Sequence, residues 1–221
     1  MRRVLVRDVM TAPVVTVREN TPFKELVRTL AEHRISAVPV LDPADHVVGI
    51  VSEADLLPKQ EYRDEPAAFS LLMSRAEQVS RLKAAADTAG QLMTTAVVTV
   101  RADQTVVDAA RLMDRKQLKR LPVLDTRGEL VGMVSRVDLL TVFLREDTEI
   151  EAEIATEVFE RTLGLEAGAV TIDVRDGVVA LTGTLDDKSH VRMALQLTRR
   201  VDGVVDVIDH LHYRFDDTRI P

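Results

Sequence analysis

Two similar stretches, identical at seven of eleven positions, indicate how the chain folds: "VVGIVSEADLL", Val47 to Leu57, and "LVGMVSRVDLL", Leu130 to Leu140. Each places a β-branched run around a glycine directly before a serine and an aspartate three residues apart. Such a run favours a strand, and Ser-x-x-Asp ahead of leucines favours the start of a helix. The chain therefore encodes one strand-to-helix junction twice.

The similarity extends beyond these stretches, so the chain contains an internal repeat. Residues 10–57 align with residues 93–140 without a gap, and about 19 of the 48 positions are identical. In each copy a short β-rich segment (14–17 or 97–100) leads into an amphipathic helix, two β-branched runs separated by a turn, and a closing helix. Each copy is therefore predicted to fold as β-α-β-β-α, with the two sheets packed into one core.

Smaller features of the repeated region carry further predictions. Met10 and Met93 occupy matching positions, which favours core packing over redox sensing. Between the copies, residues 76–86 favour a helix, whereas the polar segment 58–67 is expected to be mobile. Apolar residues at helical spacing are Phe23, Leu26, Val27 and Leu30 in the first copy and Val106, Ala109, Ala110 and Met113 in the second.

Composition and charge limit the function classes. The chain has 221 residues, 46% of them apolar and 29% charged, which is typical of two or three folded units. No cysteine is present, so disulfide frameworks and thiolate sites are excluded. The start "MRRVLVRDVMTAPVV" lacks the features of a signal peptide, and no run approaches the ~20 apolar residues of a membrane span. We therefore expect a cytoplasmic protein.

The net charge of -7 comes from the last third of the chain. Residues 1–148 hold 21 acids and 21 bases, whereas residues 149–221 hold 15 acids and 8 bases. This acidity argues against nucleic acid and anionic membranes as partners, because both require clustered Lys and Arg. The sequence has no nucleophile elbow, Walker loop or paired acid and base, so a non-enzymatic role is expected.

The acidic last third has its own pattern, α-β-β-α-β. A first helix is predicted to end at Gly164, a hairpin turns at Asp176-Gly177, and Ser189 is expected to cap a second helix. A last strand includes His210 and His212, which share a face and could begin a metal site, but an ordinary exposed strand face is favoured. Residues expected to face the core are Ile150, Ile154, Val158 and Leu163 in the first helix and Val205, Val207 and Ile208 around the last strand.

Several sequence motifs of this chain are similar to motifs of two known families. "MTAPVVTV", "VPVLD" and "VVGIVSEADLL", with their second copies, resemble the tandem cystathionine-β-synthase (CBS) domain pair, or Bateman module, over roughly residues 5–145. "VRDGVVALTGTL" and "VDGVVDVIDHL" resemble the BON domain. The resemblance implies an α+β protein with two CBS repeats packed as a pseudo-twofold pair and a small sandwich domain. The expected boundaries are 1–60 for CBS repeat 1, 61–88 for a connecting segment with a helix, 89–145 for CBS repeat 2, 148–215 for the BON-like domain and 216–221 for a tail.

The repeated serine and aspartate have a structural and a ligand-binding interpretation. As N-caps, Ser52 and Ser135 with Asp55 and Asp138 in the first helical turn need no ligand. A helix N-terminus also attracts phosphate, and a carboxylate can accept hydrogen bonds from a ribose diol. The CBS resemblance implies that the aspartates hold ribose, that the serines lie near phosphate, and that adenine lies among strand residues. Those strand residues are Thr16, Ile35 and Val38 in the first copy and Thr99, Leu118 and Leu121 in the second.

The two copies differ in charge around these junctions. Glu53 follows the first serine where Arg136 follows the second, and only the second copy has Lys119 and Arg120 before its strand. A base near phosphate favours binding and an acid opposes it. The pocket of Asp138 should therefore bind a charged adenosine ligand better than that of Asp55. For Lys119 and Arg120, a solvated face or an ion pair at the rim remains the alternative.

The resulting hypothesis is a regulatory sensor of adenine nucleotides (AMP, ADP, ATP or a relative), with no other cofactor and no metal. The resemblance implies a homodimer through the CBS helices, and residues 148–215 are expected to contact an unknown protein partner in signal transduction. One alternative is a ligand-free, stress-associated dimeric scaffold in which both junctions are only helix caps. Another is a phospholipid-contacting protein, which the BON resemblance suggests and the acidity opposes.

Overall fold

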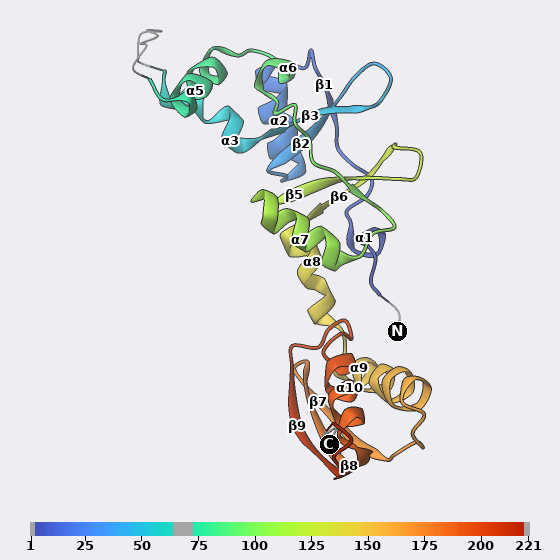
Figure 1. Ribbon diagram of the computed structural model, residues 1–221. Coiled ribbons are helices and arrows are strands. Elements are labelled where there is room, and N and C mark those ends of the chain that lie inside the picture. The colour runs from blue at the N-terminus through green and yellow to red at the C-terminus, as the bar shows by residue number, and fades with distance from the viewer. Residues whose placement is uncertain (1–2, 64–72, 219–221) are drawn as a thin grey trace. The chain divides into compact units, whose positions relative to one another are not determined.

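A computed structural model describes residues 3–63 and 73–218 (Figure 1). The chain divides into two compact units. One consists of Met1–Val9, Thr105–Leu112 and Arg136–Pro221, and the other of Met10–Gln104 and Met113–Ser135. The described residues form three three-stranded sheets, ordered β1-β2-β3, β4-β5-β6 and β7-β8-β9.

The first repeat has the predicted β-α-β-β-α order. Its elements are β1 (Val17–Arg18), α2 (Phe23–His33), β2 (Ala37–Leu41), β3 (Val47–Ser52) and α3 (Glu53–Leu56). Strand β1 runs parallel to β2, and β2 runs antiparallel to β3. The first strand starts later than the predicted 14–17 and is only two residues long. All five residues of β2 are buried, as expected for a strand covered on both faces.

The second repeat reproduces this order and its pairing. Its elements are β4 (Val100–Arg101), α7 (Val106–Lys116), β5 (Arg120–Leu124), β6 (Leu130–Ser135) and α8 (Arg136–Leu140). The register places Ala37 opposite Ser52 in the first sheet and Arg120 opposite Ser135 in the second. The same irregularity occurs at Leu41 and at Leu124, so the sequence repeat is a repeat of backbone geometry.

The turn inside each repeat is also built in the same way. Asp42 Oδ1 accepts the amides of Ala44 and His46 at 2.8 and 2.9 Å. Asp125 Oδ1 accepts the amides of Arg127 and Glu129 at the same two distances. These bonds lower the pKa of both aspartates, and the largest cause is the amide of His46 for Asp42 and of Glu129 for Asp125.

Each repeat is completed by the segment that precedes the other. Four isolated bridges make the exchange: Leu5 with Thr105, Thr11 with Met133, Pro22 with Thr88 and Ile50 with Thr94. Met93 packs over Gly49 of the first repeat, and Met10 packs over Gly132 of the second. The expected packing role of the two methionines is thus confirmed, and each lies against the glycine of the other copy.

In the part of the chain that the structure describes, four short helices connect and flank the repeats: α1 (Val6–Val9), α4 (Pro58–Glu61), α5 (Arg75–Ala85) and α6 (Ala89–Leu92). Helix α5 confirms the helix predicted for residues 76–86. The mobility expected for residues 58–67 is wrong for Pro58–Glu61, which is helical with Pro58 buried. Residues 64–67 lie outside the described part of the chain.

The core of the first repeat includes residues of α6 as well as its own. Its buried members are Val17, Leu26, Leu30, Val38, Val40, Val51, Ala86, Ala89 and Leu92. In α2, Val27 was expected in this core but is 44% exposed, and in α7 Ala110 is exposed while Val106, Ala109 and Met113 are buried. The apolar stripe of each helix is therefore one position narrower than predicted.

The last domain has the predicted α-β-β-α-β order. The 3-10 turn η1 (Thr141–Leu144) precedes α9 (Asp147–Glu153), which continues as the π-helix η2 (Ile154–Thr162). Then come β7 (Val170–Arg175), β8 (Val178–Asp187), α10 (Lys188–Thr198) and β9 (Asp206–Phe215). Strand β8 is antiparallel to β7 and parallel to β9.

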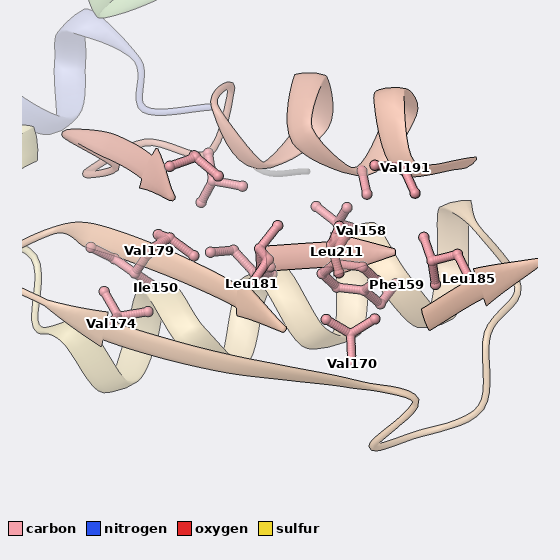
Figure 2. Close-up of a cluster of buried hydrophobic side chains, with 14 residues drawn as sticks. Ile150, Val158, Phe159, Val170, Val174, Val179, Leu181, Leu185, Val191 and Leu211 are labelled. Carbon is pink, nitrogen blue, oxygen red and sulfur yellow. The ribbon is translucent and has the colours of Figure 1, made fainter. Parts of the chain in front are cut away.

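One apolar core lies between this sheet and its helices. Figure 2 shows Ile150, Val158 and Phe159 of the first helix meeting strand residues such as Leu181 and Leu211. The hairpin prediction is confirmed, because Asp176 and Gly177 have φ of 50° and 74° and a two-residue turn of this kind needs positive φ at both positions. Gly164, with φ of 68°, ends the first helix as expected.

Two local expectations for this domain are wrong. Asp187, not Ser189, is the N-cap of α10, and the Ser189 amide donates to the Asp217 carboxylate at 2.9 Å. Val205 is 59% and Ile208 44% exposed, whereas Val207 is buried. Ile208 follows Val207 on β9 and so faces the opposite side of the sheet.

Candidate functional site

The first strand-to-helix junction is a helix cap. Strand β3 ends at Ser52, helix α3 begins at Glu53, and Asp55 is the third helical residue. The Asp55 carboxylate accepts two hydrogen bonds through Oδ2, from the amide and the hydroxyl of Ser52, each at 2.7 Å. The capping interpretation is confirmed for this copy.

The second oxygen of Asp55 has a partner that the sequence did not indicate. The ammonium of Lys83, on α5, donates to Asp55 Oδ1 and forms an ion pair with it. The Lys83 side chain is only 18% exposed and the Asp55 side chain only 12%. Both carboxylate oxygens are thus engaged by the protein itself. A buried acid requires a partner, and this requirement was the one signal from which an ion pair at Asp55 could have been predicted. The local pattern of residues 76–86 does not indicate which residue is that partner.

The connecting segment is attached to the first repeat at a second lysine. Lys59 donates to the Ala86 carbonyl at 2.6 Å and to the Asp87 carboxylate at 2.9 Å. Its ammonium also lies 4.9 Å from the centroid of the Phe23 ring. These contacts hold the end of α5 beside α2 and α4 without involving Asp55.

Arg120 joins the two copies. It is the first residue of β5, with its backbone opposite Ser135. Its guanidinium donates to the hydroxyl of Ser36, the residue just before β2, and the Ser36 carbonyl accepts the amide of Glu53 at 3.1 Å. The guanidinium therefore lies close to the first junction while its backbone begins at the second. Its neighbour Lys119 is exposed.

The second junction lies at the same place in its repeat as the first junction does in the first repeat. Strand β6 ends at Ser135, α8 begins at the exposed Arg136, and Asp138 is the third helical residue and is partly buried. The two copies therefore have the same order along the chain: a strand that ends at a serine, a helix start, and an aspartate at the third helical position.

The residues predicted to contact adenine occupy different depths. Val38 and Leu121 are fully buried, so neither their side chains nor their backbone are accessible to a ligand in this conformation. Ile35 and Leu118 are partly buried just before β2 and β5. Ahead of β1 and β4, Thr16 is exposed and Thr99 partly buried.

Two other kinds of site are not seen in residues 3–63 and 73–218. No group of three or more His, Cys, Asp or Glu side chains is placed to hold a metal ion, and His210 and His212 are both exposed on β9. Among the helices of these residues, none has both the length and the apolar character to cross a bilayer.

The duplicated fold and its two junctions define a paired-repeat protein with an additional small α+β domain. The family model of the CBS domain matches residues 6–61 and 89–145, and that of the BON domain matches residues 146–214. The chain therefore belongs to the CBS-domain family and carries a tandem CBS pair followed by a BON domain.

Relatives and solved structures resemble the CBS part. The chain is 32% identical over 154 residues to the uncharacterized protein MJ1426 of Methanocaldococcus jannaschii, covering 63% of this chain and 91% of the relative. It is similar to the structure of CBSX2 of Arabidopsis thaliana in complex with AMP, with 28% identity and a TM-score of 0.55. It is also similar to the CBS domain pair of protein MJ0100 in complex with 5′-methylthioadenosine and S-adenosyl-L-methionine, with 25% identity and a TM-score of 0.50. Each of these two matches covers 64% of this chain and 97% of the other.

Proposed function

We propose that this chain is a non-enzymatic regulatory protein whose CBS pair binds an adenosine-type ligand such as AMP, ADP or ATP. The observation that carries the proposal is the junction of strand, hydroxyl, helix start and carboxylate, built twice in the same register. The complexes of CBSX2 with AMP and of MJ0100 with two adenosine derivatives support this class of ligand.

In this proposal each group has a separate chemical task. The carboxylate of Asp138 accepts hydrogen bonds from the ribose hydroxyls, and Ser135 with the start of α8 interacts with phosphate. Arg136 adds positive charge beside Asp138, which favours anionic ligands over neutral adenosine, whereas the guanidinium of Arg120 is bonded to Ser36 near the first junction. The first copy contributes less, because Lys83 already engages Asp55 and the adjacent residue is Glu53.

We further propose that the BON domain passes the ligand state to a protein partner and that the CBS pair forms a homodimer. A ligand can shift the protein between two arrangements only by its difference in affinity for them. The acidic charge of residues 149–221 favours a protein partner over an anionic lipid surface. The lack of cysteine suits a reducing, cytoplasmic compartment.

Calorimetric titration of the full chain with AMP, ADP, ATP and cyclic dinucleotides tests the ligand, with thermal melts as a second readout. We expect binding heat and a raised melting temperature for at least one of them. A mass spectrum of small molecules released from the purified protein provides an independent check for a co-purified adenine nucleotide.

A second function, a ligand-free dimeric scaffold, is favoured by one observation. The hydrogen bonds of Ser52 and the ion pair of Lys83 account for the first junction without any ligand. Absence of both heat and thermal shift with every nucleotide would support the scaffold and refute the sensor.

A further inference from the structure

The first junction differs from an open nucleotide site at its carboxylate. To hold a ribose diol, Asp55 would need to direct free acceptor positions at the ligand. Instead Oδ2 accepts two bonds from Ser52 and Oδ1 accepts the ammonium of Lys83. With both side chains largely enclosed, a ribose could reach this carboxylate only by displacing Lys83.

Lys83 is held in place by more than its own ion pair. Helix α5 carries it, and the end of that helix is fixed three residues later, where the buried Ala86 belongs to the core of the first repeat. Lys59 then bonds to the carbonyl of the same Ala86. Moving Lys83 away from Asp55 would therefore disturb a packed helix end, whereas an exposed lysine would simply swing into solvent.

The closure depends on a residue outside the repeated sequence. The aligned copies end at Leu57 and Leu140, and Lys83 lies in the connecting segment between them. The connecting segment thus supplies the first junction with a cation that the repeated sequence itself does not contain.

We propose that Lys83 occupies the position of a ribose at the first junction and closes that site, so that the chain binds one adenosine-type ligand rather than two. This inference rests on the proposed function for its ligand. It assigns Lys83 a role in binding stoichiometry: the connecting helix blocks one of two sites that share the same backbone.

The test is the number of AMP molecules bound per full-length chain in calorimetry. We expect one for the wild type and two for Lys83→Met, which removes the ammonium but keeps the apolar stem. Lys59→Met is the matched control, because it removes the lysine of α4 that bonds to Ala86 and Asp87 without touching Asp55. It should still bind one. Thermal melts establish that each variant is folded.

A second variant keeps the test decisive if Lys83→Met does not fold. Asp55→Asn in the wild-type background should leave AMP affinity within about threefold if the first site is closed, since the substitution is then remote from the ligand. A loss of tenfold or more would show that Asp55 holds ligand and would overturn the closure. Two AMP per wild-type chain, or an unchanged number in folded Lys83→Met, would overturn it as well.

The closure and the proposed function fail in different ways. If the wild type binds no AMP but Lys83→Met binds one, the closure holds and the assignment of the open ligand site to Asp138 is wrong. If neither binds, removing Lys83 has opened no site and the closure is refuted. If the wild type binds one and Lys83→Met also binds one, the sensor stands and only the closure is lost.

Discussion

The two CBS repeats share a backbone but differ in what surrounds their carboxylates. Strand registers, the turn aspartates and the position of the aspartate in the closing helix all coincide. At the first junction Lys83 pairs with Asp55, and the sequences of the two junctions differ in that Arg136 stands in place of Glu53. Duplication therefore preserved the geometry of the site, while its chemistry changed through a few charges, one of them outside the repeat.

The ion pair of Lys83 gives the largest expected effect on stability. Asp55→Ala should lower the free energy of unfolding by about 3 kcal/mol, because it leaves an enclosed ammonium without its partner and removes the helix cap. Urea unfolding of the full chain measures this loss. The double variant Asp55→Ala with Lys83→Met should recover part of it, since the unpaired charge is then gone. No recovery would mean that the pair contributes only through the cap.

The carboxylate of Asp138 should contribute to the affinity for ligand, whereas that of Asp55 contributes to the ion pair with Lys83. Asp138→Ala should weaken AMP binding by about 100-fold, or about 2.7 kcal/mol, if it loses two hydrogen bonds from ribose hydroxyls to a charged acceptor. Calorimetry compares it with Asp55→Ala, for which we expect less than a threefold change. Equal losses for the two variants would contradict the asymmetry between the repeats.

The features that could be predicted from the sequence are local, whereas the contacts that could not be predicted join residues far apart along the chain. The β-α-β-β-α order, the first junction and the hairpin at Asp176 follow from patterns within about ten residues, where periodicity and turn chemistry act. The pair of Asp55 and Lys83 joins residues 28 positions apart, and no local pattern encodes it. Likewise, the matching methionines indicated packing but not that Met93 lies over Gly49 of the other copy.

Errors within the elements have local causes. Val27 and Ala110 have the spacing of a helix face but lie at the edge of the stripe, where exposure begins. Ser189 looks like a cap, yet α10 starts two residues earlier and the amide of Ser189 is satisfied by Asp217 from beyond β9. The complete burial of Val38 and Leu121 could not be predicted either. Periodicity identifies an apolar strand, but it does not indicate which of its residues remain accessible to a ligand.

The exchanged methionines allow the backbone symmetry itself to be tested. A methyl group at position 49 would lie 2.8 Å from Met93 Cβ, whereas one at position 132 would lie 3.2 Å from Met10 Cβ. Overpacking of this kind typically costs about 1–3 kcal/mol, so we expect about 2 for Gly49→Ala and about 1 for Gly132→Ala. Urea unfolding of both variants gives the comparison. A larger loss for Gly132→Ala would show that the two exchanges do not pack as described.

Substitution of the turn aspartates, Asp42 and Asp125, should have the smallest effect on stability, and the two repeats should agree most closely in the size of that effect. Both have a folded-state pKa below the unfolded value of 3.8, so their stabilisation is present above about pH 4 and is lost as the pH falls through the lowered pKa. Asp42→Asn and Asp125→Asn should therefore each lower the melting temperature at pH 7, by similar amounts, and much less at pH 3. Asparagine can still accept the turn amides, so the difference reports charge alone. Thermal melts at both pH values measure it. If only one variant loses its effect in acid, the turns share their geometry but not their electrostatics, as the two junctions do.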